Sequence, residues 1–500
     1  MSPTPRPEDG AAVSPGLTLR DRAVRGVAWS AGQKLSVRLS TIAAFIVLSR
    51  QLGPEDFGVV ALATSLIAVL AILTELGLAT FLVQETELDE ATTSTAFWAS
   101  AVTGAGLAAL LSLSGPLVAD AFDAPALRVV VPVLSLSVLL SGLSSVQLAL
   151  LQRRMQFRAL ATRQVSATVV ASVVAVILAL LGAGVWALVV QVLLRDAIAL
   201  VVLWRASGWR PSRRFSRPAL RRMSRYGGKV LGMNLLIQVR DRTEDVVIAS
   251  VLGTAGLGVW VVARRILTIV FDVAVSVIAT VALPVFATVK HDRSRLLRVL
   301  ENSRAMTALV VLPTLGALAV LSPGLVPLVF GPQWEASADL ARLLTVAATL
   351  GVLVYYDRAI LLSINRAGVE LAVLAGIVVA HVGVVLVAAP HGLTVLAYAL
   401  MGRALLTLPV RFFVLRRVAG VPLSNYHRVG VLVLCTLLAA AVAQGVLLLT
   451  ASWAEVLSLG AAGLVFAGVY LLTLLVAARA TLLSLVDDAR RLRRRGAAVA

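Results

Sequence analysis

Several charged side chains lie inside segments that are otherwise apolar, and their types and spacing suggest binding or proton-transfer chemistry. Lys34 and Arg38 are spaced i, i+4, so they share one face of a helix. Basic side chains can bind an anionic group, and carboxylates can hold a proton. The densest group lies near the middle of the chain and consists of Asn234, Gln238, Arg240, Asp241, Arg242, Glu244 and Asp245.

Helical spacing predicts two local ion pairs in this dense group. Arg240 can pair with Glu244, and Arg242 with Asp245, which leaves Asp241 without a local partner. A charge at the centre of a bilayer costs ~2.5–3.5 kcal/mol, so we expect these groups to face a solvated pathway, with interhelical salt bridges as the alternative. The other charges inside apolar segments are Glu75, Arg195, Asp196, Arg264, Arg265, Asp272, Asp357, Arg358 and Arg403.

Residue types that usually carry catalysis are scarce. His381 stands alone in an apolar segment and is expected to be a packed or lipid-adjacent residue. Cys435 is the single cysteine and can form no internal disulfide. The sequence contains no H-E-x-x-H, G-x-S-x-G or P-loop motif and no paired His or Cys ligands. We therefore expect no metal, no cofactor and no enzymatic activity.

The elements that position these charges are long apolar helices. The chain has 500 residues, of which 59% are hydrophobic and 14% charged, and its mean hydropathy is +0.93. Spanning a bilayer takes ~20 helical residues, and runs of that length recur along the chain. The sequence predicts an all-α polytopic membrane protein with about fourteen transmembrane helices, at 25–49, 57–83, 92–119, 127–150, 160–181, 184–206, 227–251, 256–287, 300–321, 337–364, 368–389, 392–415, 428–449 and 455–480.

Lysine and arginine gather in every second connector between these helices. Cytoplasmic connectors carry an excess of such residues, so both termini are expected in the cytoplasm and the helix count is expected to be even. The net charge of +19 is then mostly a topology signal, with binding to lipid headgroups as a by-product and no role in binding nucleic acid. The basic segments are 20–25, 153–158, 210–225, 290–298, 366, 416–428 and 490–495.

A short turn recurs in the two halves of the chain. Leu52 to Val60 reads LGPEDFGVV, and Leu252 to Trp260 reads LGTAGLGVW, with the Leu, both glycines and a Val in register. Helices one and seven would both run outward to these turns, which predicts two parallel six-helix lobes plus two C-terminal helices. The expected parts are a leader at 1–24, an N-lobe at 25–206, a linker at 207–226, a C-lobe at 227–416, two accessory helices at 417–480 and a basic tail at 481–500.

The segment from Leu52 to Gly58 resembles the polysaccharide/oligosaccharide flippase family of the multidrug/oligosaccharidyl-lipid/polysaccharide exporter superfamily. The segments Leu151 to Leu160, Glu244 to Arg265 and Leu328 to Trp334 resemble other parts of that family in the expected order. One departure is the unusually charged seventh helix, with Glu244 at a position where the family commonly has Asp.

The resemblance implies alternating-access transport of a polyprenyl-diphosphate-linked oligosaccharide across the bacterial cytoplasmic membrane. It also implies service to lipopolysaccharide, capsule or exopolysaccharide assembly, alongside a polymerase and glycosyltransferases, and a monomer is expected. Two alternatives stay open: a drug or small-cation antiporter of the same superfamily with an acidic cavity, and a scaffold without a cavity.

On this hypothesis, basic residues attract the diphosphate, because a desolvated phosphate needs cationic hydrogen-bond donors. The expected binding residues are Lys34, Arg38, Arg240, Arg242, Arg264 and Arg265. The acids expected to tune the field or carry a coupling proton are Glu75, Asp241, Glu244, Asp245 and Asp272.

Overall fold

The computed structural model describes residues 36–75, 78–85, 88–288, 293–364 and 366–477, and all regular structure in these ranges is helical. A first helix covers residues 36–51. The helices that follow are α2 (Pro54–Glu75), α3 (Leu78–Gln84), α4 (Glu90–Leu113), α5 (Gly115–Ala121), α6 (Leu127–Arg153), α7 (Phe157–Leu180), α8 (Val185–Ser207), α9 (Arg217–Thr288), α10 (Arg293–Phe330), η1 (Pro332–Trp334), α11 (Glu335–Val354), α12 (Asp357–Ser363), α13 (Ala367–Ala388), η2 (Ala389–His391), α14 (Leu393–Val418), η3 (Leu423–Tyr426), α15 (His427–Leu449) and α16 (Glu455–Ala477).

The prediction of a polytopic helical membrane protein is confirmed. Within the described ranges, 12 helical stretches are long and apolar enough to cross a membrane. One of them, Arg240–Asp272, is divided by a kink, and the helix at 36–51 is not among them. The number fourteen therefore stays a prediction.

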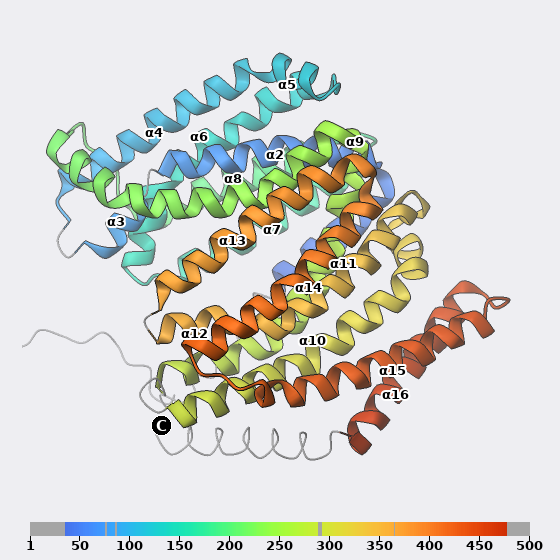
Figure 1. Ribbon diagram of the computed structural model, residues 1–500. Helices are drawn as coiled ribbons and strands as arrows, with labels where there is room; N and C mark the ends of the chain where they lie inside the picture. The colour runs from blue at the N-terminus through green and yellow to red at the C-terminus, as the bar shows by residue number, and fades with distance from the viewer. Residues whose placement is uncertain (1–35, 76–77, 86–87, 289–292, 365, 478–500) are drawn as a thin grey trace, which may run out of the picture.

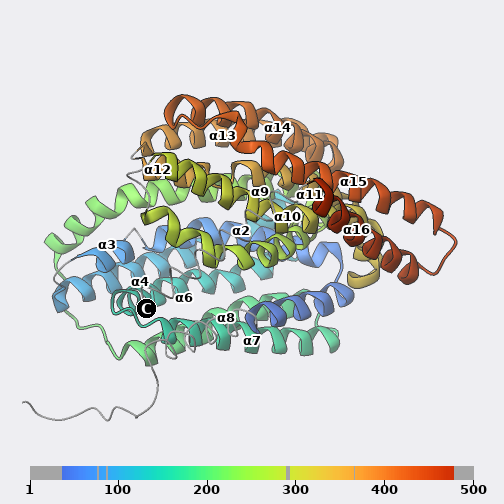
Figure 2. The same cartoon turned by 90° about the horizontal axis from the view of Figure 1, so that it is seen from below.

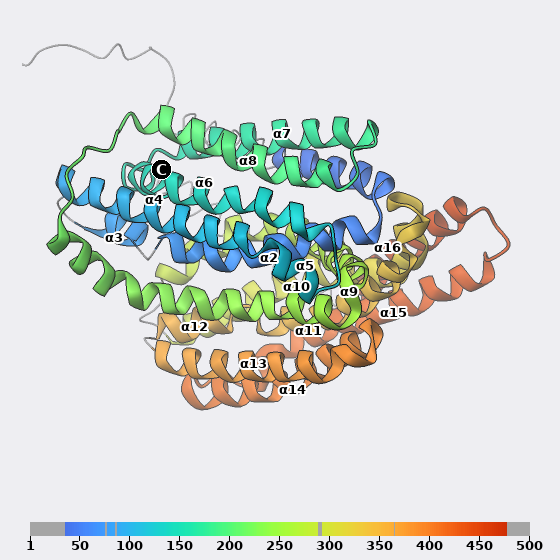
Figure 3. The ribbon, with the colours of Figure 1, turned by 90° about the horizontal axis from the view of Figure 1, so that it is seen from above.

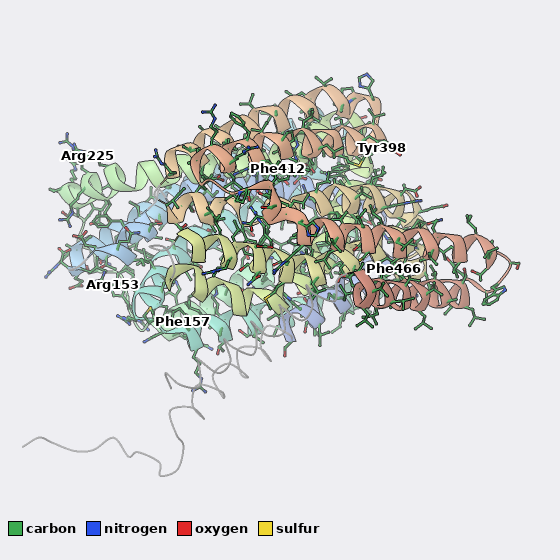
Figure 4. The ribbon with its side chains drawn as sticks, turned by 60° about the horizontal axis from the view of Figure 1, so that its bottom comes forward. Arg153, Phe157, Arg225, Tyr398, Phe412 and Phe466 are labelled. Carbon is green, nitrogen blue, oxygen red and sulfur yellow. The ribbon has the colours of Figure 1, made fainter. Side chains whose placement is uncertain are left out.

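The helices lie roughly parallel, so the connectors gather at two ends of the bundle (Figure 1). Figure 4 shows Arg153, Phe157 and Arg225 together near one end and Tyr398 and Phe466 toward the other. At the first of these ends, Arg153 donates a 3.2 Å hydrogen bond to the carbonyl of Leu82. We call this the basic end, because the arginine-rich connectors after α6 and before α9 lie there.

The helices form layers across the bundle. In Figure 2, α7 and α8 lie at one edge and α13 and α14 at the opposite edge, and α2, α4 and α6 occupy the layers next to α7 and α8. α2 packs against α6 on one side and against α9 on the other. The pair α15 and α16 packs against α10 and extends from one corner of the bundle (Figure 1).

Gly253 breaks α9 into two helices. Its φ of 74° and ψ of 177° are values that glycine adopts readily and that side-chain-bearing residues avoid. The predicted boundary between helices seven and eight therefore lies at the second glycine-containing turn. The helix before Gly253 begins at Arg217, so it includes ten residues of the segment expected to be the linker at 207–226.

The two recurrent turns meet each other. A Cβ atom built on Gly58 would lie 2.5 Å from the carbonyl carbon of Thr254, and one built on Gly258 would lie 2.6 Å from the carbonyl carbon of Pro54. Only glycine permits two backbones to approach this closely. We call this the Gly58–Gly258 crossing, and the end of the bundle that contains it the crossing end.

Further contacts fasten the crossing end. Arg50 donates hydrogen bonds of 2.8 and 2.6 Å to the carbonyls of Val329 and Leu328 at the end of α10. Trp334 donates a 2.8 Å bond to the carbonyl of Ser49. Segments that carry the family resemblance, Leu52 to Gly58 and Leu328 to Trp334, are thus neighbours, and they join the two halves of the chain.

Two buried ion pairs hold the second half together. Arg304 of α10 lies 2.6 Å from Asp357 of α12, and both side chains are fully buried. Arg411 of α14 lies 2.6 Å from Glu370 of α13. These pairs connect helices that are consecutive or nearly so in the second half, and none of the four residues lines the cavity described next.

Candidate functional site

A cavity of about 850 Å³ lies between the first half of the chain and the two parts of α9. Its lining residues come from the helix at 36–51 and from α2, α6, α7, α8 and α9. At one end it reaches Phe57 and Val261, next to the Gly58–Gly258 crossing. It extends toward Leu148 and Leu203, which lie within two turns of the ends of α6 and α8 at the basic end.

Positive charge dominates the polar part of this lining. Among the described residues, five arginines and two aspartates line the cavity. Three of the arginines, Arg242, Arg264 and Arg265, belong to the set expected from the sequence to bind substrate. The lining residues that carry charge are Arg163, Arg195, Asp196, Arg242, Asp245, Arg264 and Arg265.

An ion network on α9 holds two of these arginines in place. Asp245 is almost completely buried and accepts from Arg264 at 2.7 Å and from Arg242 at 3.3 Å. Ser65 of α2 donates a 2.7 Å bond to the same carboxylate. The predicted pair of Arg242 with Asp245 is confirmed. Because Asp245 accepts from both cations and a hydroxyl, it orients them toward the cavity and offsets part of their charge.

Glu244 has different partners from the one that sequence spacing predicted. It lies 3.2 Å from Arg264 and 3.3 Å from Nε2 of His381 on α13, and it accepts a hydrogen bond from Trp260. The predicted pair with Arg240 is wrong, because the kink at Gly253 brings the second part of α9 back beside the first. The expectation of a merely packed or lipid-adjacent His381 is also incomplete, since the histidine is buried against a carboxylate.

Asp241 also has a partner, contrary to the expectation from spacing. Its carboxylate lies 2.6 Å from Arg240, its neighbour in sequence. Both side chains are about one-third to one-half exposed, at 32% for Arg240 and 44% for Asp241. Neither residue lines the cavity. Gln238, on the same stripe, donates a 3.5 Å bond to the carbonyl of Ala68 on α2.

The remaining predicted residues are not brought into the cavity lining. Arg38 is partly buried in the helix at 36–51, and Asp272 is exposed on α9. Neither is among the lining residues. Glu75 is the last residue of α2, and its side chain lies outside the described part of the protein, as does that of Asn234. Lys34, the leader at 1–24 and the tail at 481–500 also lie outside the described residues.

The cavity includes polar residues that are not in the set expected to bind substrate. Arg163 and Gln164 stand near the start of α7, and Gln191 and Arg195 stand on one face of α8. Arg195 pairs with Asp196 at 3.2 Å, as one would expect for a local salt bridge. The signal available in the sequence was polar residues at helical spacing in two otherwise apolar helices. These residues are Arg163, Gln164 and Thr168 in α7 and Gln191, Arg195 and Asp196 in α8.

The arrangement is suited to binding an anion with several oxygen atoms. Arg265 is exposed to the cavity and makes no ion pair or hydrogen bond among the described residues. Arg242 lies in the first part of α9 and Arg264 in the second, and Asp245 holds both guanidinium groups. Arginine presents planar donors that match phosphate or carboxylate oxygens, and these bonds are stronger in a cavity of low dielectric than in water.

Comparison with known proteins gives a consistent family. A family model described as "Polysaccharide biosynthesis protein" matches residues 47–339. The succinoglycan biosynthesis transport protein ExoT of Rhizobium meliloti is 29% identical over 323 residues, which cover 65% of this chain and 65% of that protein, just under two thirds of its length. The lipopolysaccharide biosynthesis protein WzxC of Escherichia coli is 23% identical over 340 residues, covering 67% of this chain and 68% of that protein.

Solved structures show the same fold. The lipid II flippase MurJ in an inward closed conformation superposes with a TM-score of 0.74. The match covers 90% of this chain and 99% of that one at 12% sequence identity. At this level of identity the similarity concerns the arrangement of helices alone.

Proposed function

This chain belongs to the polysaccharide biosynthesis protein family, and we propose that it carries a polyprenyl-diphosphate-linked oligosaccharide across the cytoplasmic membrane by alternating access. The observation that carries the proposal is the group Arg242, Arg264 and Arg265 in a cavity of about 850 Å³ between the two halves of the chain. A diphosphate is the anionic part of such a lipid, and it needs cationic donors once it leaves water. The product would serve lipopolysaccharide, capsule or exopolysaccharide assembly.

The shape of the cavity supports a mechanism in two steps. The crossing end is closed by the Gly58–Gly258 crossing and by the bonds of Arg50, while the cavity extends toward the basic end. If the basic end is cytoplasmic, as the distribution of arginine predicts, the substrate enters from the cytoplasm. Separation of the two halves at the crossing end then releases it on the other side.

The proposal extends to location and partners. We place the protein in the bacterial cytoplasmic membrane with both termini in the cytoplasm, as a monomer in contact with membrane lipids. Glycosyltransferases of the same pathway would supply its lipid-linked substrate, and a polymerase would consume the translocated product. Among the described residues, the cationic lining favours this substrate over the small cations of an antiporter, because both lining acids, Asp196 and Asp245, are already paired with arginine.

The test is a flipping assay in proteoliposomes with a fluorescent polyprenyl diphosphate that carries one hexose. Arg265→Ala removes a cavity cation that makes no ion pair in the described part of the chain, so the protein should stay folded. Loss of a charge-assisted bond of about 1.5–3 kcal/mol should slow flipping by about tenfold or more. The matched control is Arg128→Ala, because Arg128 forms a 2.7 Å pair with Asp120 at an exposed site outside the cavity.

Three results would oppose the proposal. Wild-type protein that does not flip the lipid would remove the function itself. An Arg265→Ala protein that is folded and as fast as wild type would remove the arginine cluster as the diphosphate site. A loss in Arg128→Ala equal to that in Arg265→Ala would point to a general effect of net charge.

A further inference from the structure

The wall of the cavity formed by α6 carries a line of hydroxyl groups. Ser137, Ser141, Ser144 and Ser145 all line the cavity, and their spacing places them along one face of α6. α6 and α9 both line the cavity, and α2 packs against each of them, as Figure 3 shows by its position between the two. The serines therefore lie on a different wall from the arginines of α9.

Some of these hydroxyls have no hydrogen-bond partner among the residues that the structure describes. Ser137 is only 5% exposed, and its Oγ makes no hydrogen bond among the described residues. Ser141 likewise makes none. Ser144 and Ser145 donate to carbonyls of their own helix at 2.7 and 3.0 Å, so their oxygens can still accept. A buried hydroxyl without a partner is costly, so Ser137 indicates that a ligand or water supplies the missing bond.

Neighbouring helices add amides and another hydroxyl to this wall. Thr168 of α7 and Gln191 of α8 line the same cavity, and neither makes a side-chain hydrogen bond among the described residues. Arg163 of α7 also lines it, and its Nε is buried with no hydrogen-bond partner in the described ranges. Hydroxyl and amide groups both donate and accept hydrogen bonds, which is the pattern that matches the hydroxyl groups of a sugar ring.

We propose that Ser137 and Ser141 bind the hydroxyl groups of the sugar attached directly to the diphosphate. This inference rests on the proposed function, because it assigns the two walls of one cavity to two parts of the same lipid. The arginines of α9 bind the diphosphate, and the hydroxyl wall of α6, α7 and α8 binds the proximal sugar. The hydroxyl and amide groups of this wall then let the protein distinguish a glycosylated lipid from the bare diphosphate lipid.

The experiment measures the binding of two probes to the purified full-length protein. One probe is a polyprenyl diphosphate that carries a single hexose, and the other is the same polyprenyl diphosphate without sugar. The double variant Ser137→Ala and Ser141→Ala should bind the hexosylated probe about tenfold more weakly and the bare probe as wild type does. Arg265→Ala should weaken both probes by a similar factor.

The matched control is Ser135→Ala on the same helix. Ser135 is buried, donates to the carbonyl of Pro132 at 2.7 Å and does not line the cavity, so this variant should leave the ratio of the two affinities unchanged. A control that changes this ratio as much as the double variant does would overturn the proposal.

Different results would overturn the proposed function and the role of the two serines. If wild type binds neither probe, the proposed function is wrong. If wild type binds both and Arg265→Ala weakens both, the function stands, and the inference is tested by the serine variant alone. A double variant that loses both probes equally, or loses neither, would overturn the role of Ser137 and Ser141. Wild-type protein that binds the hexosylated probe no more tightly than the bare one would also overturn it.

Discussion

The Gly58–Gly258 crossing gives the sharpest prediction about the closed end of the bundle. A Cβ atom on Gly258 would lie 2.6 Å from the carbonyl carbon of Pro54 and 3.1 Å from the backbone nitrogen of Gly58. Non-bonded carbon atoms sit about 3.5–4.0 Å apart, so Gly258→Ala must move the two helices apart by at least about 0.9 Å. All of the clashing atoms named here belong to backbone, which no side-chain rotation can relieve.

The expected size of the effect follows from the packing. Overpacking of a close contact costs about 1–3 kcal/mol. In a protein that alternates between two states, this energy falls on the state in which the crossing is closed. A shift of about 1–3 kcal/mol changes the ratio of the two states by about 5- to 150-fold. Gly258→Ala should therefore favour the state that is open at the crossing end.

Labelling of a cysteine placed at Ala61 would measure this shift. Ala61 follows Gly58 by about one turn of α2 and lines the cavity. The single native cysteine, Cys435, is buried and can be replaced by alanine. In cells, a membrane-impermeant maleimide added outside should label Cys at position 61 faster when Gly258→Ala is present.

The matched control is Gly106→Ala, because in the described part of the protein nothing beyond its own stretch of α4 lies within 4 Å of a Cβ built on Gly106. It should leave the labelling rate unchanged. If Gly258→Ala also leaves both labelling and thermal stability at wild-type values, then the crossing does not hold the protein closed and the reasoning is refuted.

Two further predictions concern stability. Arg304→Met leaves Asp357 buried without its 2.6 Å partner, which should lower the free energy of unfolding by about 3–5 kcal/mol and lower the melting temperature in detergent. Adding Asp357→Leu should recover most of the lost stability, and a double variant as unstable as Arg304→Met alone would contradict this expectation. The pKa of Asp89, which caps α4, is held below its usual value chiefly by hydrogen bonds from Thr92. Its contribution is therefore present at neutral pH and is lost as the pH falls through the folded-state pKa. Asp89→Ala should lower the melting temperature at about pH 7 and by progressively less as the pH falls through the folded-state pKa of Asp89, and equal losses at neutral and acid pH would show that the ionised cap is not responsible.

Much of the architecture was available from the sequence, because a bilayer imposes strong local rules. Apolar runs of about 20 residues mark helices whatever they pack against, and the polytopic helical class followed from them. The pair of Arg242 with Asp245 was also predictable, since both residues lie on one face of one helix. The family resemblance rested on short turn motifs such as Leu52 to Gly58, whose order along the chain needs no knowledge of contacts.

Contacts between distant segments could not be predicted in the same way. The sequence gives no means to see that the kink at Gly253 would set Arg264 beside Asp245, or that α13 would bring His381 to Glu244. Spacing alone does not distinguish the serines of α6 from the small residues of a packed helix, and only the cavity shows which face they line. Periodicity assigns a residue to a face, and only packing decides what that face meets.

The sequence by itself determined the class of protein, the approximate helices, the family resemblance and the presence of costly charges inside apolar segments. The tertiary structure decided which of those charges meet. It separated Arg242, Arg264 and Arg265, which line the cavity, from Arg38 and Arg240, which do not. The physical reason is that the cost of a buried charge is a local property, whereas its compensation depends on partners that can lie on any other helix.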